Sequence, residues 1–85
     1  MKTYKMKLFL IKEGWKKVSK QVSDKKTYLL YKRDKEYCEI CYDRKRLQWY
    51  QVTTISGELR GYRNFVSGAS YYAKDVKEQV DKCIL

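Results

Sequence analysis

Cys38 and Cys41 have the spacing of half a zinc-binding site. Zinc usually takes four protein ligands, but the chain has no histidine and Cys83 would supply only a third sulfur. On a strand, residues three positions apart point to opposite faces of the sheet. A redox-active pair would need the motif at the start of a helix, where the helix dipole lowers the pKa of a thiol. We therefore expect no metal site, and reduced structural thiols in a cytoplasmic protein.

Residue types that support catalysis are scarce. General acid–base catalysis at neutral pH most often uses histidine, which is absent. No pair of carboxylates stands in an apolar segment that would separate their pKa values. Gly57, Gly61 and Gly68 lack the strand-to-helix context of a phosphate-binding loop. Tyrosine can attack a phosphodiester, but among nine tyrosines packing explains any one better. We expect a protein that is not an enzyme and uses no cofactor.

Basic residues interleaved with aromatic residues carry the strongest functional signal. Arginine binds phosphate or guanine through paired hydrogen bonds, and tyrosine stacks on exposed bases. Glu39 and Asp43 share a predicted sheet face with Tyr37 and would repel phosphate, so the contact surface should involve the N-terminal lysines and the 44–46 turn. The candidate nucleic-acid-binding or partner-binding residues are Lys5, Lys7, Lys16, Lys17, Lys20, Arg44, Lys45, Arg46, Arg60, Tyr62 and Arg63.

The positive charge is concentrated toward the N-terminus. The chain has 20 basic and 10 acidic residues, a net charge of +10. Residues 1–26 contain nine lysines and two acidic residues, residues 27–63 contain eight basic and five acidic residues, and residues 64–85 contain three of each. A clustered positive field attracts polyanions, so we expect nucleic acid, DNA or RNA, to bind mainly through its phosphates.

The same residues support a second hypothesis. Tyrosine, tryptophan and arginine are the usual anchors of protein interfaces, although lysine is not. A basic module carrying Trp15 and Trp49 could dock onto an acidic protein surface and block it. A third interpretation is a soluble surface in which lysine happens to dominate.

The chain is expected to form one small domain over residues 1–85. With 85 residues it can bury one modest core, and no linker, low-complexity tract or internal repeat divides it. No apolar run approaches the roughly 20 residues of a membrane span, and Lys2, Lys5 and Lys7 interrupt the apolar block that a secretory signal would need. We expect no membrane association, and leave open that strand edges pair two copies.

Alternating apolar and polar residues predict an antiparallel sheet of four to five strands. Residues 15–22 fit a helix or a strand, and a strand is favoured as the return arm of a hairpin. The other predicted strands cover residues 3–11, 27–31, 36–42, 47–55 and 59–65.

A different period follows Gly68. Apolar residues then recur at spacings of four and three residues, which predicts an amphipathic helix. These residues are Ala69, Ala73, Val76, Val80 and Cys83. The predicted fold is therefore of the α+β class, with the C-terminal helix packed on one face of the sheet.

The second half of the chain resembles a known kind of small protein. The pattern consists of Trp49-Tyr50-Gln51-Val52, Gly61-Tyr62-Arg63-Asn64-Phe65 and the spaced Ser67, Ala73 and Val76. Over about residues 36–84 it is similar to the three-strand-plus-helix DNA-binding modules of phage integrases and their AP2-like relatives. The resemblance implies a sheet laid in a DNA groove, although Glu39 and Asp43 depart from the pattern and no base-reading residue is matched. It also implies a phage or mobile-element setting, where small proteins often inhibit host defence or replication enzymes, so the acidic partner of the second hypothesis would be a host or anti-phage defence protein.

Overall fold

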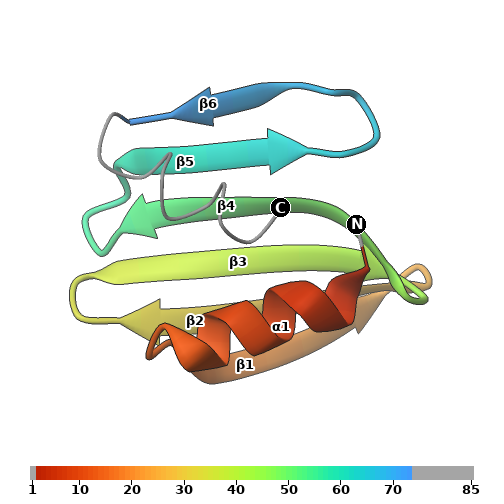
Figure 1. Ribbon diagram of the computed structural model, residues 1–85, viewed down its shortest axis with the longest axis horizontal. Coiled ribbons are helices and arrows are strands. Elements are labelled where there is room, and N and C mark those ends of the chain that lie inside the picture. The colour runs from red at the N-terminus through yellow and green to blue at the C-terminus, as the bar shows by residue number, and fades with distance from the viewer. Residues whose placement is uncertain (1, 74–85) are drawn as a thin grey trace.

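The structure is a computed structural model that describes residues 2–73. It contains one helix followed by six strands that form a single sheet (Figure 1). The elements are α1 (Thr3–Lys12), β1 (Lys16–Ser23), β2 (Lys26–Arg33), β3 (Glu36–Asp43), β4 (Arg46–Thr54), β5 (Leu59–Asn64) and β6 (Ser70–Tyr72).

The strands form a simple meander in which each pairs antiparallel with the next. The first three hairpins have two-residue turns, at Asp24-Lys25, Asp34-Lys35 and Arg44-Lys45. Asp24 and Lys25 both have positive φ, 49° and 68°, as the type I′ turn of a twisted hairpin requires. Because successive turns alternate between the two ends of a meander, the first and third turns lie at the same end, and the second lies at the other.

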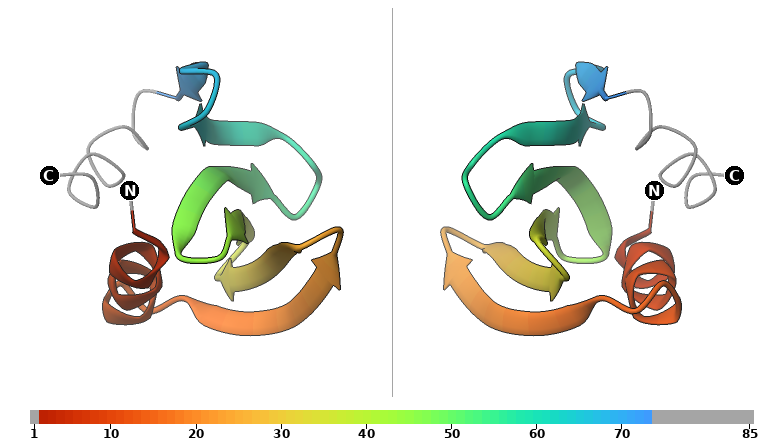
Figure 2. Two further views of the ribbon diagram at one scale, coloured as in Figure 1. Left: turned by 90° about the vertical axis from the view of Figure 1, so that its right-hand side faces the viewer. Right: turned by 90° about the vertical axis from the view of Figure 1, so that its left-hand side faces the viewer.

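The main core lies between α1 and one face of the sheet. Met6 and Leu10 of α1 pack with Leu29 of β2, Ile40 of β3 and Tyr50 of β4, all of them buried. The sheet is strongly curved, and α1 lies on one side of it, near β1 and β2 (Figures 1 and 2). The packing of this short helix on the curved sheet fixes the position of both helix ends.

The opposite face of the sheet carries a smaller cluster. Tyr28 and Trp49 lie with their ring centres 6.2 Å apart, and Cys41 is their partner in the strand register. Cys38 instead belongs to the main core, so the two cysteines point to opposite faces. Burial raises the pKa of the Cys41 thiol, which is fully enclosed.

The prediction of a strand over residues 3–11 is wrong, since this segment is the helix α1. Thr3, Met6 and Leu10 are its buried residues, spaced by three and four positions as on one helix face. Leu8, which shares the period-two pattern with Met6 and Leu10, is exposed. The Met, Leu, Phe and Lys residues of this segment fit the period of a strand as well as that of a helix. Met, Leu and Lys are strong helix formers, which favours the helix.

The prediction of four to five strands with a C-terminal helix is also wrong. Residues 2–73 contain six strands, and the start of the predicted helical stripe overlaps β6, where Tyr71 and Tyr72 pair with β5. Asn64 donates its backbone N–H to the carbonyl of Ala69 at 2.8 Å, and Ala73 donates to Arg60 at 2.8 Å. Adjacent tyrosines favour a strand beside an open sheet edge. The rest of the predicted helix, residues 74–83, lies outside the described residues.

The other strand predictions are confirmed. Residues 15–22 mostly fall in β1, an exposed edge strand whose lysines suit such an edge. The strands predicted between residues 27 and 65 correspond to β2 to β5. Within the described residues, no helix has the length and apolar character needed to cross a membrane.

Candidate nucleic-acid interface

Helix α1 begins directly beside the Arg44-Lys45 turn. The backbone of Lys2 forms an antiparallel bridge with Arg46, and the N–H of Thr3 donates to the carbonyl of Lys45 at 3.0 Å. These hydrogen bonds bring the start of the chain to the end of the β3–β4 hairpin. The first basic residue of the helix segment and the most basic turn are therefore neighbours.

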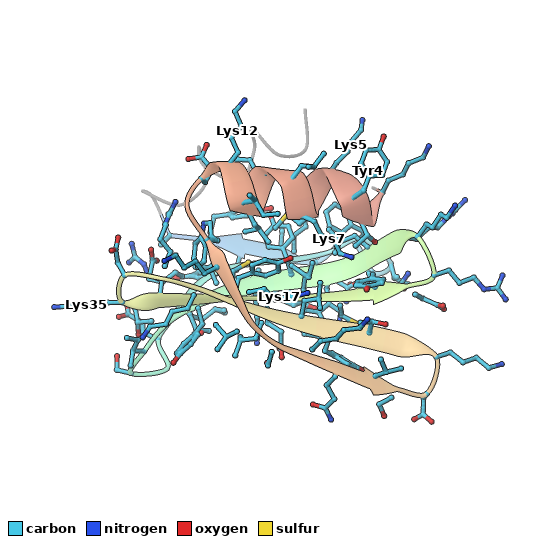
Figure 3. All side chains as sticks on the ribbon, turned by 90° about the horizontal axis from the view of Figure 1, so that it is seen from below. Tyr4, Lys5, Lys7, Lys12, Lys17 and Lys35 are labelled. Atoms are coloured by element: carbon cyan, nitrogen blue, oxygen red, sulfur yellow. The ribbon has the colours of Figure 1, made fainter. Side chains whose placement is uncertain are left out.

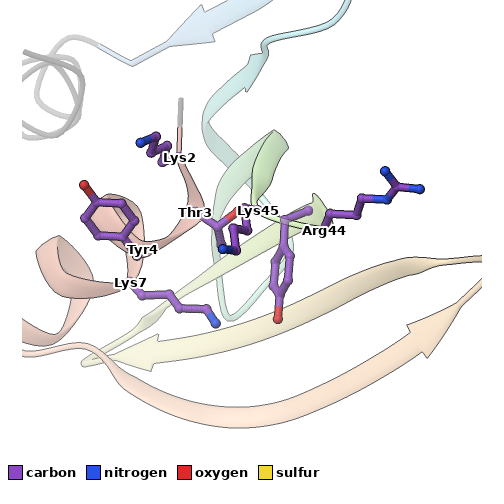
Figure 4. Close-up of a pocket in the computed structure, with 7 residues that line it drawn as sticks. Lys2, Thr3, Tyr4, Lys7, Arg44 and Lys45 are labelled. Atoms are coloured by element: carbon purple, nitrogen blue, oxygen red, sulfur yellow. The ribbon is translucent and has the colours of Figure 1, made fainter.

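A cavity of about 370 Å³ opens between the start of α1 and this turn (Figure 4). It is lined by Lys2, Thr3, Tyr4, Lys7, Tyr42, Arg44 and Lys45. Four of these residues are cationic and none is acidic. The arrangement is suited to hold an anionic group.

A second, more open hollow of about 680 Å³ shares Arg44 and Lys45 of this turn with the first cavity. Its lining residues are Lys25, Asp43, Arg44, Lys45, Arg46 and Gln48. Lys25 comes from the β1–β2 turn at the same end of the sheet. The cationic surface therefore continues from one hairpin end to the next, with Asp43 as the acidic residue among those that line it.

A third hollow, of about 340 Å³, runs between α1 and β1. Lys7 contributes from the helix, and Lys17 and Lys20 contribute from the strand. In Figure 3, Lys7 points from α1 toward the sheet, whereas Lys5 and Lys12 point away from it. The ammonium of Lys7 lies 4.8 Å from the centre of the Tyr42 ring, and both residues also line the first cavity.

The three hollows share residues and form one continuous cationic surface, which we name the basic band. Its members are Lys2, Lys7, Lys17, Lys20, Lys25, Arg44, Lys45 and Arg46. Tyr31 also lines the third hollow, and burial raises its pKa above the ordinary value of 10.0. A phosphate bound in the band would therefore meet mainly cations, with Asp43 as an acidic neighbour in the second hollow.

Six of the predicted binding residues lie in the band, and the other five lie elsewhere. Those in the band are Lys7, Lys17, Lys20, Arg44, Lys45 and Arg46. Lys5 lies on the outer side of α1, and Lys16 is opposite Lys32, on the face away from Lys17. Arg60 lines a hollow with Lys35 at the other end of the sheet.

Tyr62 and Arg63 make local contacts within the sheet. The Tyr62 hydroxyl accepts a hydrogen bond from Nδ2 of Asn64 at 3.0 Å. The guanidinium of Arg63 lies 4.9 Å from the centre of the Phe65 ring. Neither residue lines the three hollows of the basic band.

Sequence reasoning missed Lys2, Thr3 and Lys25 as members of the site. The sequence contains a pattern from which the position of Lys25 could have been predicted. The turns at 24–25, 34–35 and 44–45 recur every ten residues, and every second turn returns to the same end of the sheet. Lys2 and Thr3 have no such pattern, since their position depends on where the helix begins and on which end of the sheet it approaches.

Glu39 lines none of the three hollows of the basic band. Nε2 of Gln51 donates a hydrogen bond to the Glu39 carboxylate at 3.3 Å. Among the residues that the structure describes, no group of three or more cysteine or acidic side chains could hold a metal ion. Comparisons of the chain with protein-family models, with curated proteins and with solved structures found no match.

Proposed function

We propose that this protein binds nucleic acid without modifying it, through phosphate contacts made by the basic band. The observation that supports this function is the continuity of the band, in which three adjoining hollows share cationic lining residues. Scattered lysines would serve solubility alone, whereas a continuous row of cations follows a phosphate backbone and releases its counterions.

The size of the molecule agrees with a short binding site. The Cα atoms extend over 32 × 26 × 23 Å, which is close to one turn of a DNA duplex, about 34 Å. Lysine makes point contacts with phosphate and carries no code for base sequence, and it dominates the band. The proposed binding therefore tolerates many sequences.

The biological setting that we propose is that of a phage or mobile-element accessory protein in the host cytoplasm. Its support is the part of the resemblance carried by residues 49–52 and 61–65, together with the small size and the basic charge of the chain. The helix that the resemblance also implies does not begin after Gly68, because Ser70–Tyr72 form β6. The proposed binding mode differs from that of the resembled modules, because it uses the ends of the hairpins and the groove beside α1 rather than the open sheet face.

A specific observation favours a second candidate, the inhibition of a host or defence protein. Tyr4, Leu8 and Ile11 are 54%, 62% and 64% exposed, and their spacing of four and three residues places them along one side of α1. Apolar residues at such spacing are typical anchors of helix-mediated protein contacts. This apolar stripe runs beside Lys5 and Lys12, so an acidic protein surface would suit it.

Salt dependence of oligonucleotide binding tests the main proposal. If about six phosphates are contacted, a plot of log affinity against log salt concentration has a slope of about −5 for duplex DNA. Fluorescence anisotropy with duplex and single-stranded oligonucleotides measures this slope. A slope near zero, or no binding to either oligonucleotide at low salt, would contradict the proposal.

Capture from host lysate distinguishes the two candidates. The tagged protein is incubated with nuclease-treated lysate, alongside the variant Leu8→Ser. Leu8 is chosen because it lines none of the three hollows of the basic band, whereas Tyr4 and Ile11 do. One stoichiometric protein partner, lost in the variant, supports inhibition. Binding to purified oligonucleotides that the variant retains supports nucleic-acid binding through the basic band.

A further inference from the structure

The amino end of α1 lacks the groups that normally neutralise a helix N-terminus. The residue before the helix is Lys2, whose side chain makes no capping hydrogen bond, and the first turn contains no acidic residue. Helices usually begin after Ser, Thr, Asp or Asn, and cations are unfavourable beside the partial positive charge at this end. The N–H of Tyr4 has no acceptor within the helix because of its position in the first turn.

Thr3 adds an independent sign that a ligand is missing. Its side chain is only 4% exposed, and its Oγ1 has no hydrogen-bond partner within the described part of the chain. A buried hydroxyl without a partner costs free energy, so such groups normally have one. Thr3 lines the 370 Å³ cavity, where Figure 4 shows it beside the flexible side chain of Lys45.

The charges around the cavity select the chemical class of the ligand. Lys2, Lys7, Arg44 and Lys45 line it together with the positive end of the helix, and no acidic residue does. A phosphoryl group has several acceptor oxygens and up to two negative charges, so it can accept from several of these donors at once. A carboxylate would satisfy fewer of them.

We propose that the cavity at the start of α1 is a specific binding site for one phosphoryl group. Thr3 Oγ1 and the N–H of Tyr4 donate hydrogen bonds to it, and the four cations provide the counter-charge. The inference rests on the proposed function and deepens it, because the phosphoryl group belongs either to an internal phosphodiester of the nucleic acid or to a terminal phosphate monoester.

The test is an NMR titration of the ¹⁵N-labelled protein with inorganic phosphate, at constant ionic strength maintained with chloride. Thr3→Val removes the hydroxyl and preserves the shape of the side chain, and Thr3→Ser retains the hydroxyl. Lys45→Gln removes one cation from the site. Lys35→Gln is its matched control, because Lys35 is the second residue of the equivalent turn at the other end of the sheet.

We expect saturable shifts of the Thr3 and Tyr4 amide signals with phosphate. The affinity should fall about tenfold in Thr3→Val, as expected for a lost hydrogen bond to a charged group. Thr3→Ser and Lys35→Gln should bind like the original protein, and Lys45→Gln should bind more weakly. The site would be overturned by amide shifts no larger than those that chloride causes, or by an affinity of Thr3→Val for phosphate equal to that of the original protein. If Thr3→Val does not fold, equal affinities of Lys45→Gln and Lys35→Gln for phosphate would overturn it.

Oligonucleotides with a 5′-phosphate or a 5′-hydroxyl distinguish the two sources of the group. A terminal phosphate predicts tighter binding of the 5′-phosphorylated form, a difference that Thr3→Val abolishes. An internal phosphodiester predicts equal binding of both forms, weakened by the same factor in Thr3→Val. Salt-dependent binding that Thr3→Val leaves unchanged overturns the site and leaves the proposed function intact. Saturable phosphate binding without oligonucleotide binding supports the site and overturns the proposed function.

Discussion

The guanidinium carbon of Arg33 lies 4.5 Å from the centre of the Trp15 ring, and its Nη1 donates a hydrogen bond of 2.9 Å to the carbonyl of Glu13. This contact ties the carboxyl end of α1 to the β2–β3 turn, since Glu13 and Trp15 follow the helix directly. At the other end, the N–H of Thr3 is bonded to Lys45. Both ends of α1 are therefore fixed to hairpin turns, at opposite ends of the sheet.

Arg33→Ala should destabilise the fold. The substitution removes a cation–π contact and a hydrogen bond from a charged donor, so we expect the free energy of unfolding to fall by about 1–3 kcal/mol. Urea denaturation measures this change. Lys35→Ala, two residues further on in an exposed turn, should change it by less than about 0.5 kcal/mol. Equal effects of the two substitutions would show that the contact does not hold the helix end.

Leu8 and Leu10 provide a direct test that residues 3–12 form a helix. On α1 Leu10 is buried and Leu8 is 62% exposed, whereas on a strand both would point to the same face. Leu10→Ala should lower the free energy of unfolding by about 2–5 kcal/mol, and Leu8→Ala by less than about 0.5 kcal/mol. Similar losses for both variants, measured by urea denaturation, would restore the strand interpretation.

The central meander could be predicted because its local signals agree. Between residues 27 and 54, apolar and aromatic residues alternate with polar ones, and charged two-residue turns separate the strands. Residues 3–11 gave conflicting signals, because an unbroken apolar run from Leu8 to Ile11 fits either period. The choice between them depends on packing against Leu29 and Ile40, which the sequence does not reveal.

The candidate site could be predicted only in part, for a similar reason. The turn at Arg44 and Lys45 is visible as a charged cluster, but its neighbours come from elsewhere in the chain. Lys25 comes from a turn 20 residues earlier, and Thr3 from a helix that was predicted as a strand. An unpartnered hydroxyl such as that of Thr3 is a property of the packed structure and leaves no trace in composition or spacing.

Cys41 should make the fold sensitive to alkaline pH. Below its ordinary pKa of 9.0 the thiol is protonated in both the folded and the unfolded chain, and its contribution to stability is complete. Above pH 9 the unfolded chain loses the proton, whereas burial raises the pKa of the folded thiol and retains it. The free energy of unfolding should then fall, by up to about 1.4 kcal/mol per pH unit for one group.

Urea denaturation between pH 7 and pH 10 measures this loss, and Cys41→Ala is the comparison. The variant is less stable at pH 7 because it leaves a small cavity, but its stability should decline less steeply with pH. Tyr31, whose pKa burial raises, contributes equally to both proteins. Tyr28 does not, because its pKa is raised by burial and also by the neighbouring Cys41, so the comparison uses pH values below the ordinary tyrosine pKa of 10.0. If the free energy of unfolding falls with pH equally steeply in both proteins, burial does not protect the Cys41 thiol from losing its proton. In the folded protein at pH 7, the thiol should react only slowly with a thiol reagent.

Neighbouring lysines on β1 allow the sharpest test of the basic band. Lys17 and Lys20 line the hollow beside α1, whereas Lys16 faces the other side of the sheet, and Lys5 points outward from the helix. We compare Lys17→Gln/Lys20→Gln with Lys5→Gln/Lys16→Gln, two double variants that remove the same charge from the same part of the chain. If phosphates lie along the band, the first double variant should reduce the magnitude of the slope of log affinity against log salt concentration by about 2. The second double variant should reduce this slope much less. Fluorescence anisotropy at several salt concentrations gives both values. Because the total charge is equal in the two variants, equal losses would mean that overall charge alone attracts the nucleic acid and that the band has no special role.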